Sequence, residues 1–145
     1  MVFFGFAPCW DIDKPRFFLF QQGFFPFSKK GGTMTDCIFC KIAAGEIDSD
    51  KVYEDDSYVA FQDLNPQAPT HILVIPRRHI AAVADLEAAD EDLMGGLFRI
   101  AAKICKEQGI RDYRLVINNG EGVGQTVFHI HLHVLAGRAF GWPPG

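Results

Sequence analysis

The sequence lacks a long apolar run, an excess of basic residues and a dense set of cysteines. A membrane-spanning helix needs about 20 apolar residues in succession, so the 145 residues offer no candidate for one and we expect no membrane association. The formal net charge of -4 argues against a general nucleic-acid binder, because such proteins are usually basic. With four cysteines and no secretory signal pattern, we expect a reducing, cytoplasmic setting. A chain of this length fits one domain and can fold without disulfides.

The first 33 residues differ from the rest of the chain. They hold nine of the 14 phenylalanines and a net charge of +2, whereas the remaining 112 residues carry -6 and all five histidines. Pro8, Pro15 and Pro26 interrupt any helix or strand there. The segment fits neither a secretory signal nor a membrane helix, and one serine with two aspartates is a poor match to a transit peptide.

We interpret Met34 as the start of the functional domain, and residues 1–33 as an extension that is disordered or translated from upstream message. The run Lys29 to Thr33 favours upstream translation, because purine-rich lysine and glycine codons resemble a bacterial ribosome-binding site. A functional extension and a targeting peptide are the alternatives. The intact mass of the protein from its native source decides, since a full-length mass would contradict upstream translation.

Residues 34–145 predict an α+β domain with a mainly antiparallel five-stranded sheet, one short helix and one long helix. We expect Asp36 and Gly45 to cap and stop the short helix, and Gly109 to end the long one. Gly95 and Gly96 lower the helix propensity of the long helix, and indicate either close packing against the sheet or an exposed weak point. The predicted helices span 36–45 and 87–108, and the predicted strands span 51–54, 58–61, 71–75, 113–118 and 127–135.

Three histidines alternate along the last predicted strand. His129, His131 and His133 share one face, because alternate strand residues point the same way. Such a row suits either a metal centre or phosphorus chemistry, in which one neutral imidazole attacks and others donate protons to phosphate oxygens. The spacing alone does not choose. The preceding loop, Gly122 to Thr126, favours phosphate, because its glycines let a ligand approach the backbone and its Gln and Thr side chains offer donors.

These motifs resemble a known family. The segment Gly124 to Leu135, GQTVFHIHLHVL, is similar to the signature of the histidine-triad (HIT) superfamily, and more specifically of its HINT branch, the histidine-triad nucleotide-binding proteins. Asp63 to Pro76 and the ending Trp142 to Gly145 are similar to other blocks of that branch. The resemblance runs from about Cys37 to Gly145 and implies a HIT-like fold for the domain 34–145.

The resemblance implies a purine nucleoside phosphoramidase, which hydrolyses the phosphorus–nitrogen bond of nucleoside 5′-phosphoramidates such as AMP joined to an amine. His131 would be the nucleophile and form a nucleotidyl-histidine that water hydrolyses. His133 would contact the phosphate, His129 would complete the catalytic triad, and His71 would support the active histidine. The implied partners are purine nucleoside monophosphates and phosphoramidates, together with a second copy of the chain in a homodimer whose C-terminal segments lie near the partner's site.

The remaining implied contacts concern the nucleotide. Asp63 would accept hydrogen bonds from the ribose hydroxyls. The phosphate or the leaving group would be held by Asn118, Gly124, Gln125 and Thr126. The base pocket would be lined by Phe39, Ile42, Phe61 and Leu64, although plain core packing explains each of these equally well. Thr126 stands where family members commonly have serine, and Gln62 where some have histidine, so the hydroxyl is kept while the rate can differ.

Cys37 and Cys40 form a Cys-x-x-Cys pair, which alone fits a redox dithiol, half of a zinc site or chance. By resemblance to bacterial HIT proteins that bind a structural zinc, Cys37, Cys40, His79 and His129 would form a closed Cys₂His₂ tetrahedron. This zinc would not be required for catalysis, because some HINT proteins lack the cysteine pair. Cys9 and Cys105 have no evident partner in the sequence.

Three other functions stay open at this point. A dinucleoside polyphosphate hydrolase belongs to the same superfamily, although the ending Trp142 to Gly145 argues against it. A non-catalytic AMP-binding or scaffold protein would keep the fold without turnover. A metalloenzyme that uses all three triad histidines would lose its activity to a chelator, whereas the phosphoramidase would lose at most stability.

Overall fold

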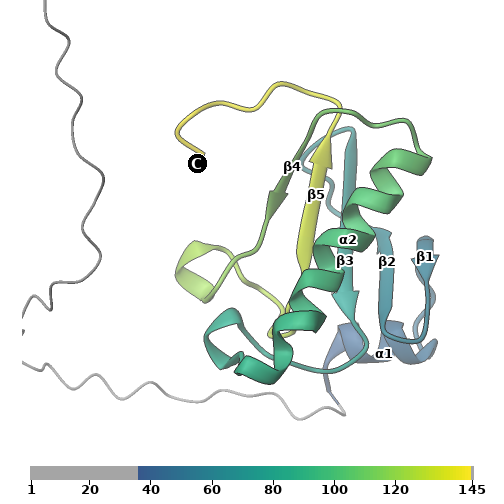
Figure 1. Cartoon of the computed structure of the whole chain (residues 1–145), viewed down its shortest axis with the longest axis vertical. Coiled ribbons are helices and arrows are strands. Elements are labelled where there is room, and N and C mark those ends of the chain that lie inside the picture. The colour runs from purple at the N-terminus through teal and green to yellow at the C-terminus, as the bar shows by residue number, and fades with distance from the viewer. Residues whose placement is uncertain (1–35, 145) are drawn as a thin grey trace, which may run out of the picture.

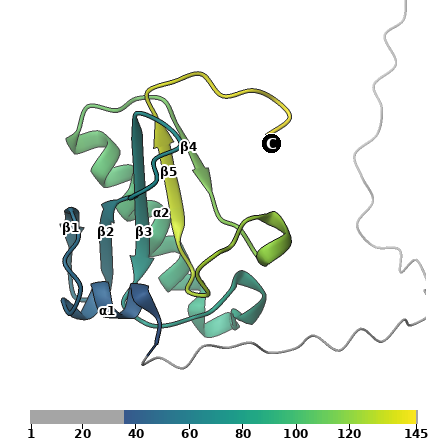
Figure 2. The same cartoon turned by 180° about the vertical axis from the view of Figure 1, so that it is seen from behind.

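In the computed structural model, which describes residues 36–144, a five-stranded sheet carries one helix on each face (Figures 1 and 2). The strand order is β1-β2-β3-β5-β4, and every neighbouring pair is antiparallel. The helices are α1 (Ile38–Ala44) and α2 (Glu91–Glu107), and the strands are β1 (Lys51–Glu54), β2 (Tyr58–Gln62), β3 (Thr70–Pro76), β4 (Tyr113–Val116) and β5 (Leu132–Ala136). The predicted α+β fold class, with one short and one long helix, is confirmed. The extension 1–33, its boundary at Met34 and the terminal Gly145 lie outside the described residues.

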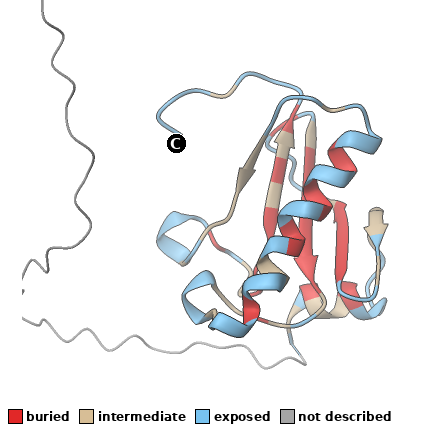
Figure 3. Cartoon of the chain, viewed as in Figure 1, coloured by how far each residue is buried: buried red, intermediate tan, exposed pale blue. Residues whose placement is uncertain are grey.

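The alternation of the strands creates two separate apolar clusters. On the α2 face, Ile72 and Val74 of β3 and Leu132 and Val134 of β5 share one apolar cluster with the buried stripe of α2, which consists of Leu97, Ile100, Ala101 and Ile104. Figure 3 shows the buried side of α2 turned toward the sheet. On the α1 face, Phe61 and Leu73 pack with Phe39 and Ile42. His133 lies directly opposite Leu73 in the sheet, so it belongs to the α1 face. Within residues 36–144, no helix combines the length and the apolar composition that crossing a bilayer requires.

The largest boundary error concerns β5, which begins at Leu132 rather than at residue 127. The residues before it bond outside the sheet, because the Ile130 N–H donates to the Ile80 carbonyl (2.7 Å) instead of joining the strand ladder. The long helix is also shorter than predicted, since residues 88–90 form a 3₁₀ turn closed by a capping box of Glu87 and Asp90. β4 ends at Val116 rather than at residue 118.

The ends of the helices follow the predictions only in part. The N-cap of α1 is Cys37, without a side-chain cap hydrogen bond, so the prediction of Asp36 as the N-cap was wrong. Gly45 ends this helix as predicted, with a left-handed φ of 78° that glycine adopts without strain. Gly109, with a φ of 71°, directly follows the C-cap residue of α2, as predicted for its end.

Gly95 and Gly96 of α2 have different surroundings, and each fits one of the two interpretations drawn from the sequence. A Cβ on Gly96 would overlap the ring and hydroxyl of Tyr58, whose Oη donates to the Leu93 carbonyl (3.0 Å). A Cβ on Gly95 would meet no atom within 4 Å. Gly96 is therefore the close contact with the sheet, and Gly95 is the exposed weak point.

These surroundings predict opposite effects for two matched substitutions. Gly96→Ala is expected to lower the free energy of unfolding by about 1–3 kcal/mol, because the added methyl group displaces Tyr58 in a packed core. Gly95→Ala is expected to raise it by about 0.5–1 kcal/mol through helix propensity. Urea unfolding of both variants measures the two changes. Equal changes in the free energy of unfolding would show that the Tyr58 side chain moves away from the added methyl group at no cost.

Candidate active site

The predicted catalytic histidines gather on the side of the sheet that α1 covers. His71 comes from β3 and His133 from β5, and their ring centroids are 5.1 Å apart. Phe39 of α1 places its ring edge-on to His131, at a centroid distance of 5.2 Å, and to His129, at 6.0 Å. The short helix therefore packs directly on the triad, and it carries the cysteine pair at its start.

His129 is completely buried, and its two ring nitrogens have different partners. Its Nε2 lies 2.8 Å from the Pro76 carbonyl oxygen, which only accepts, so Nε2 carries the proton and donates it. Its Nδ1 is left with a lone pair, which faces the side chains of Cys37, Cys40 and His79. Burial lowers the pKa of His129 to about 4, which keeps this imidazole neutral at pH 7.

The spacing of this group fits a tetrahedral metal centre. With Zn–N bonds of about 2.0–2.1 Å and Zn–S bonds of about 2.3 Å, neighbouring ligand atoms should lie about 3.3–3.8 Å apart. His129 Nδ1 is 3.5 Å from each cysteine Sγ and 3.2 Å from His79 Nδ1, and Cys40 Sγ is 3.3 Å from His79 Nδ1. The four side chains brought together from the N-cap of α1, α1 itself, the loop after β3 and the segment before β5 can therefore bind a metal.

The protonation of these ligands also suits a metal. Burial, with a further contribution from Cys37, raises the pKa of the Cys40 thiol to about 11, so this thiol stays protonated at pH 7 unless a cation stabilises the thiolate. Two thiolates would balance a divalent cation, and two neutral imidazoles would complete four ligands without an open position. Such a closed centre holds structure together rather than binding substrate.

His131 is nearly buried, and a backbone carbonyl sets its tautomer. Its Nδ1 lies 2.7 Å from the carbonyl oxygen of His129, so Nδ1 carries the proton and Nε2 keeps its lone pair. Burial lowers the pKa of this histidine, against the opposing effect of that carbonyl. His131 therefore presents a neutral imidazole with a free nitrogen lone pair, which is the form required of a nucleophile.

His133 has the opposite tautomer to His131, with its proton on Nε2. A series of hydrogen bonds from Gln67 through His71 to His133 determines it. The Gln67 N–H donates to Nδ1 of His71 (3.1 Å), so the proton of neutral His71 sits on Nε2. This Nε2–H faces Nδ1 of His133 (2.8 Å), with the Asp63 carboxylate 3.3 Å away. His133 then carries its proton on Nε2, a buried atom with no hydrogen-bond partner among residues 36–144.

The same hydrogen bonds indicate whether Asp63, His71 and His133 form a metal site or a proton relay. Two histidines and a carboxylate within 4.8 Å of one another are a possible metal group. Metal binding through Nε2 of His71 would move its proton to Nδ1, where the Gln67 N–H already points. Two donors would then face each other, so the geometry favours a hydrogen-bonded relay.

His131 and His133, the two triad histidines that do not face the cysteines, have complementary tautomers. His131 offers a lone pair on Nε2, His133 offers an Nε2–H, and their ring centroids are 4.9 Å apart. Burial lowers the pKa of His133 to about 4, so both rings are neutral at pH 7. His129 faces the cysteines instead, and no metal group within residues 36–144 contains all three triad histidines. The arrangement can attack an electrophilic centre through one ring and donate a proton through the other.

The glycine-rich loop before the triad is held by Gln125, whose side chain is almost fully buried. Its amide N–H groups donate to the carbonyls of Ala81 (2.7 Å) and Val127 (3.2 Å), and its Oε1 accepts from the Gly120 N–H (2.8 Å). Both N–H groups of the Gln125 side chain, which was predicted to face phosphate, are therefore engaged with the backbone. Thr126 is exposed, and Asn118 is half-buried beside Gly124, which adopts a φ of 92°.

The residues predicted for a base pocket fall into two groups. Phe39, Ile42 and Phe61 are buried in the α1-face cluster, where the rings of Phe39 and Phe61 meet edge to face at 5.6 Å. Leu64 is 100% exposed in the loop after β2, next to Asp63. The structure thus brings three of the four together beside the histidines and leaves Leu64 in solvent.

Sequence reasoning missed the residues that act through the backbone or brace the helix. Gln67 and Pro76 orient His71 and His129 by main-chain groups, which leave no signal in residue type. Arg77 bonds to the carbonyls of Ala43 at the end of α1 and of Asp55 between β1 and β2. The only sign of this role in the sequence is that Arg77 is a charged residue directly after the buried strand β3.

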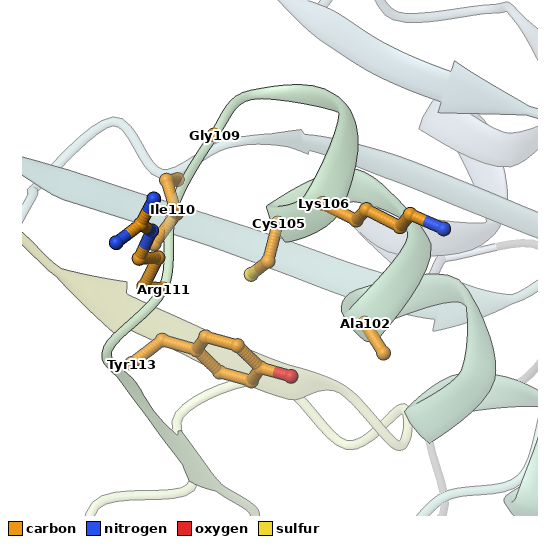
Figure 4. A pocket seen from close by; sticks show the side chains of 7 residues that line it. All are labelled: Ala102, Cys105, Lys106, Gly109, Ile110, Arg111 and Tyr113. Carbon is orange, nitrogen blue, oxygen red and sulfur yellow. The ribbon is translucent and has the colours of Figure 1, made fainter.

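The cavity shown in Figure 4 lies elsewhere in the molecule. It has a volume of about 400 Å³ at the C-terminal end of α2, and it is lined by Ala102, Cys105, Lys106, Gly109, Ile110, Arg111 and Tyr113. None of these residues belongs to the histidine cluster. The chemistry of the α1 face, and not this cavity, defines the candidate active site.

The lowered pKa values of His71 and His133 predict that stability falls in mild acid. Both groups are neutral when folded, mainly because of burial, whereas an unfolded histidine has a pKa of about 6.5. The unfolded chain therefore binds more protons below pH 6.5, so their stabilisation is complete above pH 6.5 and is lost as pH falls toward 4. Urea unfolding at pH 7, 6 and 5 measures this slope. His133→Gln should reduce it, and an unchanged slope would contradict the assignment.

Comparisons with known proteins identify the family of the chain. The HIT domain family model matches residues 44–140. The chain is 48% identical over 108 residues to the purine nucleoside phosphoramidase of Escherichia coli (strain K12), covering 73% of this chain and 91% of that protein. It is 51% identical over 111 residues to an uncharacterised HIT-like protein of Synechocystis, covering 76% and 97% of the two chains.

Solved structures show the same likeness. The crystal structure of a HIT family hydrolase from Legionella pneumophila matches with a TM-score of 0.74 and 48% identity, covering 76% of this chain and all of the other. A histidine triad protein from Clostridium difficile matches with a TM-score of 0.71 and 47% identity, covering 73% and 94% of the two chains. The resemblance drawn from the sequence is confirmed, and the chain belongs to the HIT domain family.

Proposed function

We propose that the protein is a hydrolase that cleaves the phosphorus–nitrogen bond of purine nucleoside 5′-phosphoramidates through a nucleotidyl-histidine intermediate. The observation that carries the proposal is the pair of complementary imidazoles, with a lone pair on His131 Nε2 and a proton on His133 Nε2. The 48% identity to the E. coli purine nucleoside phosphoramidase supports the substrate class. The likeness to a histidine triad nucleotide-binding protein from Candida albicans, at 31% identity and a TM-score of 0.64, supports a nucleotide as the partner.

The proposed reaction has two displacements at phosphorus. The lone pair of His131 Nε2 forms a bond to phosphorus, and the phosphorus–nitrogen bond breaks with its electron pair going to the leaving nitrogen. That nitrogen needs a proton, and the role of donor is assigned in this proposal to the Nε2–H of His133, which has no hydrogen-bond partner among residues 36–144. Water then attacks the phosphorus of the nucleotidyl-histidine and returns a proton to His133 Nε2, while the bond between phosphorus and His131 Nε2 breaks and releases the nucleoside monophosphate. Splitting one displacement into two lowers each barrier.

The other residues keep supporting roles in this proposal. Asp63, His71 and Gln67 fix the tautomer of His133, and Asp63 retains 19% side-chain exposure, from which it can also accept ribose hydroxyl bonds. Thr126 and Asn118 are the side-chain donors left for phosphate oxygens. Gly124 lets the phosphate approach the backbone, and Gln125 acts by stabilising the loop. The purine would lie against Phe39, Ile42 and Phe61, beside Leu64.

We also propose that Cys37, Cys40, His79 and His129 hold a structural zinc. When bound, the metal would stabilise the two thiolates and tie α1 to the segment that leads into β5. It supplies no step of the hydrolysis, because its four ligands close its coordination. The metal content of the purified protein tests this assignment.

A homodimer is the proposed assembly. β4 is an edge strand of the described sheet, so one side of its backbone is free to pair with another chain. The C-terminal segment, whose Trp142 is 87% exposed, leaves the sheet beyond β4 (Figure 1). Light scattering during size exclusion measures the mass, and a monomer at micromolar concentration would contradict this proposal.

The decisive experiment is incubation with an AMP–amine phosphoramidate, followed by mass spectrometry of product and protein. AMP release and an AMP adduct on His131 are expected. Turnover of a dinucleoside polyphosphate in preference to the phosphoramidate would favour the other hydrolase activity of the superfamily. Tight AMP binding without any turnover would favour a binding protein.

A further inference from the structure

Two guanidinium groups lie over the ring of Phe140. The Cζ of Arg138, in the segment after β5, is 4.1 Å from the ring centroid, and the Cζ of Arg114, on β4, is 4.8 Å from it. Each pair makes a cation–π contact. The ring brings the two positive charges together without neutralising either of them.

The hydrogen-bond partners of both arginines are neutral. Arg138 donates to the carbonyls of Gln67 (3.1 Å) and Ala139 (3.0 Å), and Arg114 donates to the carbonyl of Gly141 (2.8 Å). Neither forms an ion pair with a carboxylate of residues 36–144, although this part of the chain is acidic. Each guanidinium keeps further N–H donors in a planar fork, the geometry that binds an oxyanion bidentately.

These arginines lie on the face that carries the triad. Leu115 packs in the α2-face cluster, so its neighbours Arg114 and Val116 on β4 point to the α1 face. Val116 lies directly opposite His133, and Arg114 is the next residue on that face, about 7 Å further along the strand. Arg138 reaches the same region through Gln67, whose N–H orients His71.

The order of the strands gives the arginines a direction relative to the nucleotide. His133 on β5 lies opposite Leu73 of β3 on one side and Val116 of β4 on the other, and Leu73 lies opposite Phe61 of β2. The proposed base pocket and the arginines are therefore on opposite sides of the histidines. A nucleotide with its base near Phe61 and its phosphorus at the histidines directs the other phosphorus substituent, the amine, toward β4.

Resting on the proposed function, we propose that Arg114 and Arg138 bind a carboxylate on the leaving amine. The favoured substrates are then AMP conjugates of amino acids or peptides, joined to phosphorus through an amino group and carrying a free carboxylate. The recognised chemistry is a planar oxyanion, which bidentate guanidinium groups discriminate from a neutral amide of the same shape. Phe140 holds the two guanidinium groups in place and makes no contact with the reacting atoms.

The test compares AMP–glycine, which has a free carboxylate, with AMP–glycinamide, which is neutral and nearly the same size. Wild-type kcat/KM is expected to be about five- to tenfold higher for AMP–glycine, the size of one or two partly exposed ion pairs. The difference should lie mainly in KM. Arg114→Gln and Arg138→Gln should each bring the ratio toward one. A third substrate, AMP–phosphoethanolamine, carries a phosphate instead, and a larger gain for it than for AMP–glycine would overturn the carboxylate assignment.

Two controls separate recognition from folding. Arg111→Gln makes the same charge change at an exposed arginine outside the Phe140 group, and it should leave the ratio unchanged. The turnover of AMP–glycinamide reports whether Arg138→Gln has disturbed the Gln67 loop and His71. A wild-type ratio near one, with AMP–glycinamide still hydrolysed, would overturn this inference and leave the proposed function standing. Failure of wild type on both substrates would instead contradict the proposed function.

Discussion

Replacing His131 by alanine is expected to lower the turnover of an AMP–amine phosphoramidate by more than about a thousandfold, because the variant has no group that can form the covalent intermediate. His131 is the only triad histidine whose lone pair is free for this step. The His129 lone pair faces the cysteine group, and the nitrogen lone pair of His133 is engaged with His71. The measurement is kcat in steady state, together with the mass of the protein after a rapid acid quench.

AMP binding should survive this substitution within about tenfold, because the rest of the pocket is retained. Isothermal titration of His131→Ala with AMP is therefore the control for folding. His133→Gln offers a second comparison, since it removes a proton donor and keeps the nucleophile, with an expected loss of about 10²–10⁴-fold. An adduct should still form on His131 in that variant. Normal turnover by His131→Ala would refute the proposed mechanism.

Periodicity predicted much of this fold because alternate residues of a strand point to opposite faces of the sheet, each of which is covered by a helix. Residues such as Ile72, Val74, Leu132 and Val134 lie in the α2-face cluster, and the alternation that placed them there also put His133 on the other face. His129 and His131 precede β5, so of the three imidazoles only that of His133 was placed by strand alternation, and its side of the sheet was predictable without tertiary information. So was the link between His129 and the cysteine pair, once the Cys-x-x-Cys spacing was combined with the family resemblance.

Tautomers were not predictable, because they depend on main-chain atoms. The carbonyl of His129 determines which nitrogen of His131 can attack, and the N–H of Gln67 determines, through His71, which nitrogen of His133 can donate. Any residue supplies the same carbonyl or N–H, so the sequence carries no mark of either role. The same reason explains the misplaced start of β5, since the Ile130 N–H bonds to the Ile80 carbonyl from outside the sheet.

Gln125 shows that residue type alone does not determine the hydrogen-bond partners of a side chain. An amide beside a glycine-rich loop was interpreted as a phosphate donor, but the protein uses both of its N–H groups to hold the loop against Ala81 and Val127. Buried polar groups must be satisfied, and an irregular loop leaves carbonyls that need donors. The loop residue that stays exposed, Thr126, is the better candidate for contact with the substrate.

Removing the proposed zinc is expected to lower the free energy of unfolding by about 4 kcal/mol, the stabilisation given by a ligand present at about a thousand times its dissociation constant. The effect should be large because α1 has only seven residues, whereas isolated helices shorter than about 12–15 residues are marginal in water. Packing of Phe39 and Ile42 holds this helix on the sheet, and metal–ligand bonds would connect its first turn to His79 and His129. Chelation followed by thermal and urea unfolding measures the loss.

Cysteine substitutions assign that loss to the site. Cys37→Ala should abolish stoichiometric zinc and reproduce the effect of the chelator, whereas Cys105→Ala, at a buried thiol of the α2-face cluster, should keep the metal. Phosphoramidate turnover by the metal-free protein at 25 °C should remain within a few-fold of the holoprotein below its unfolding transition, because no step passes through the metal. A native protein without metal would contradict the zinc assignment. Complete loss of turnover in a metal-free protein that remains folded would instead show that the metal positions His131. His129 would link the two, because its Nδ1 belongs to the metal group and its carbonyl oxygen accepts the hydrogen bond from His131 Nδ1.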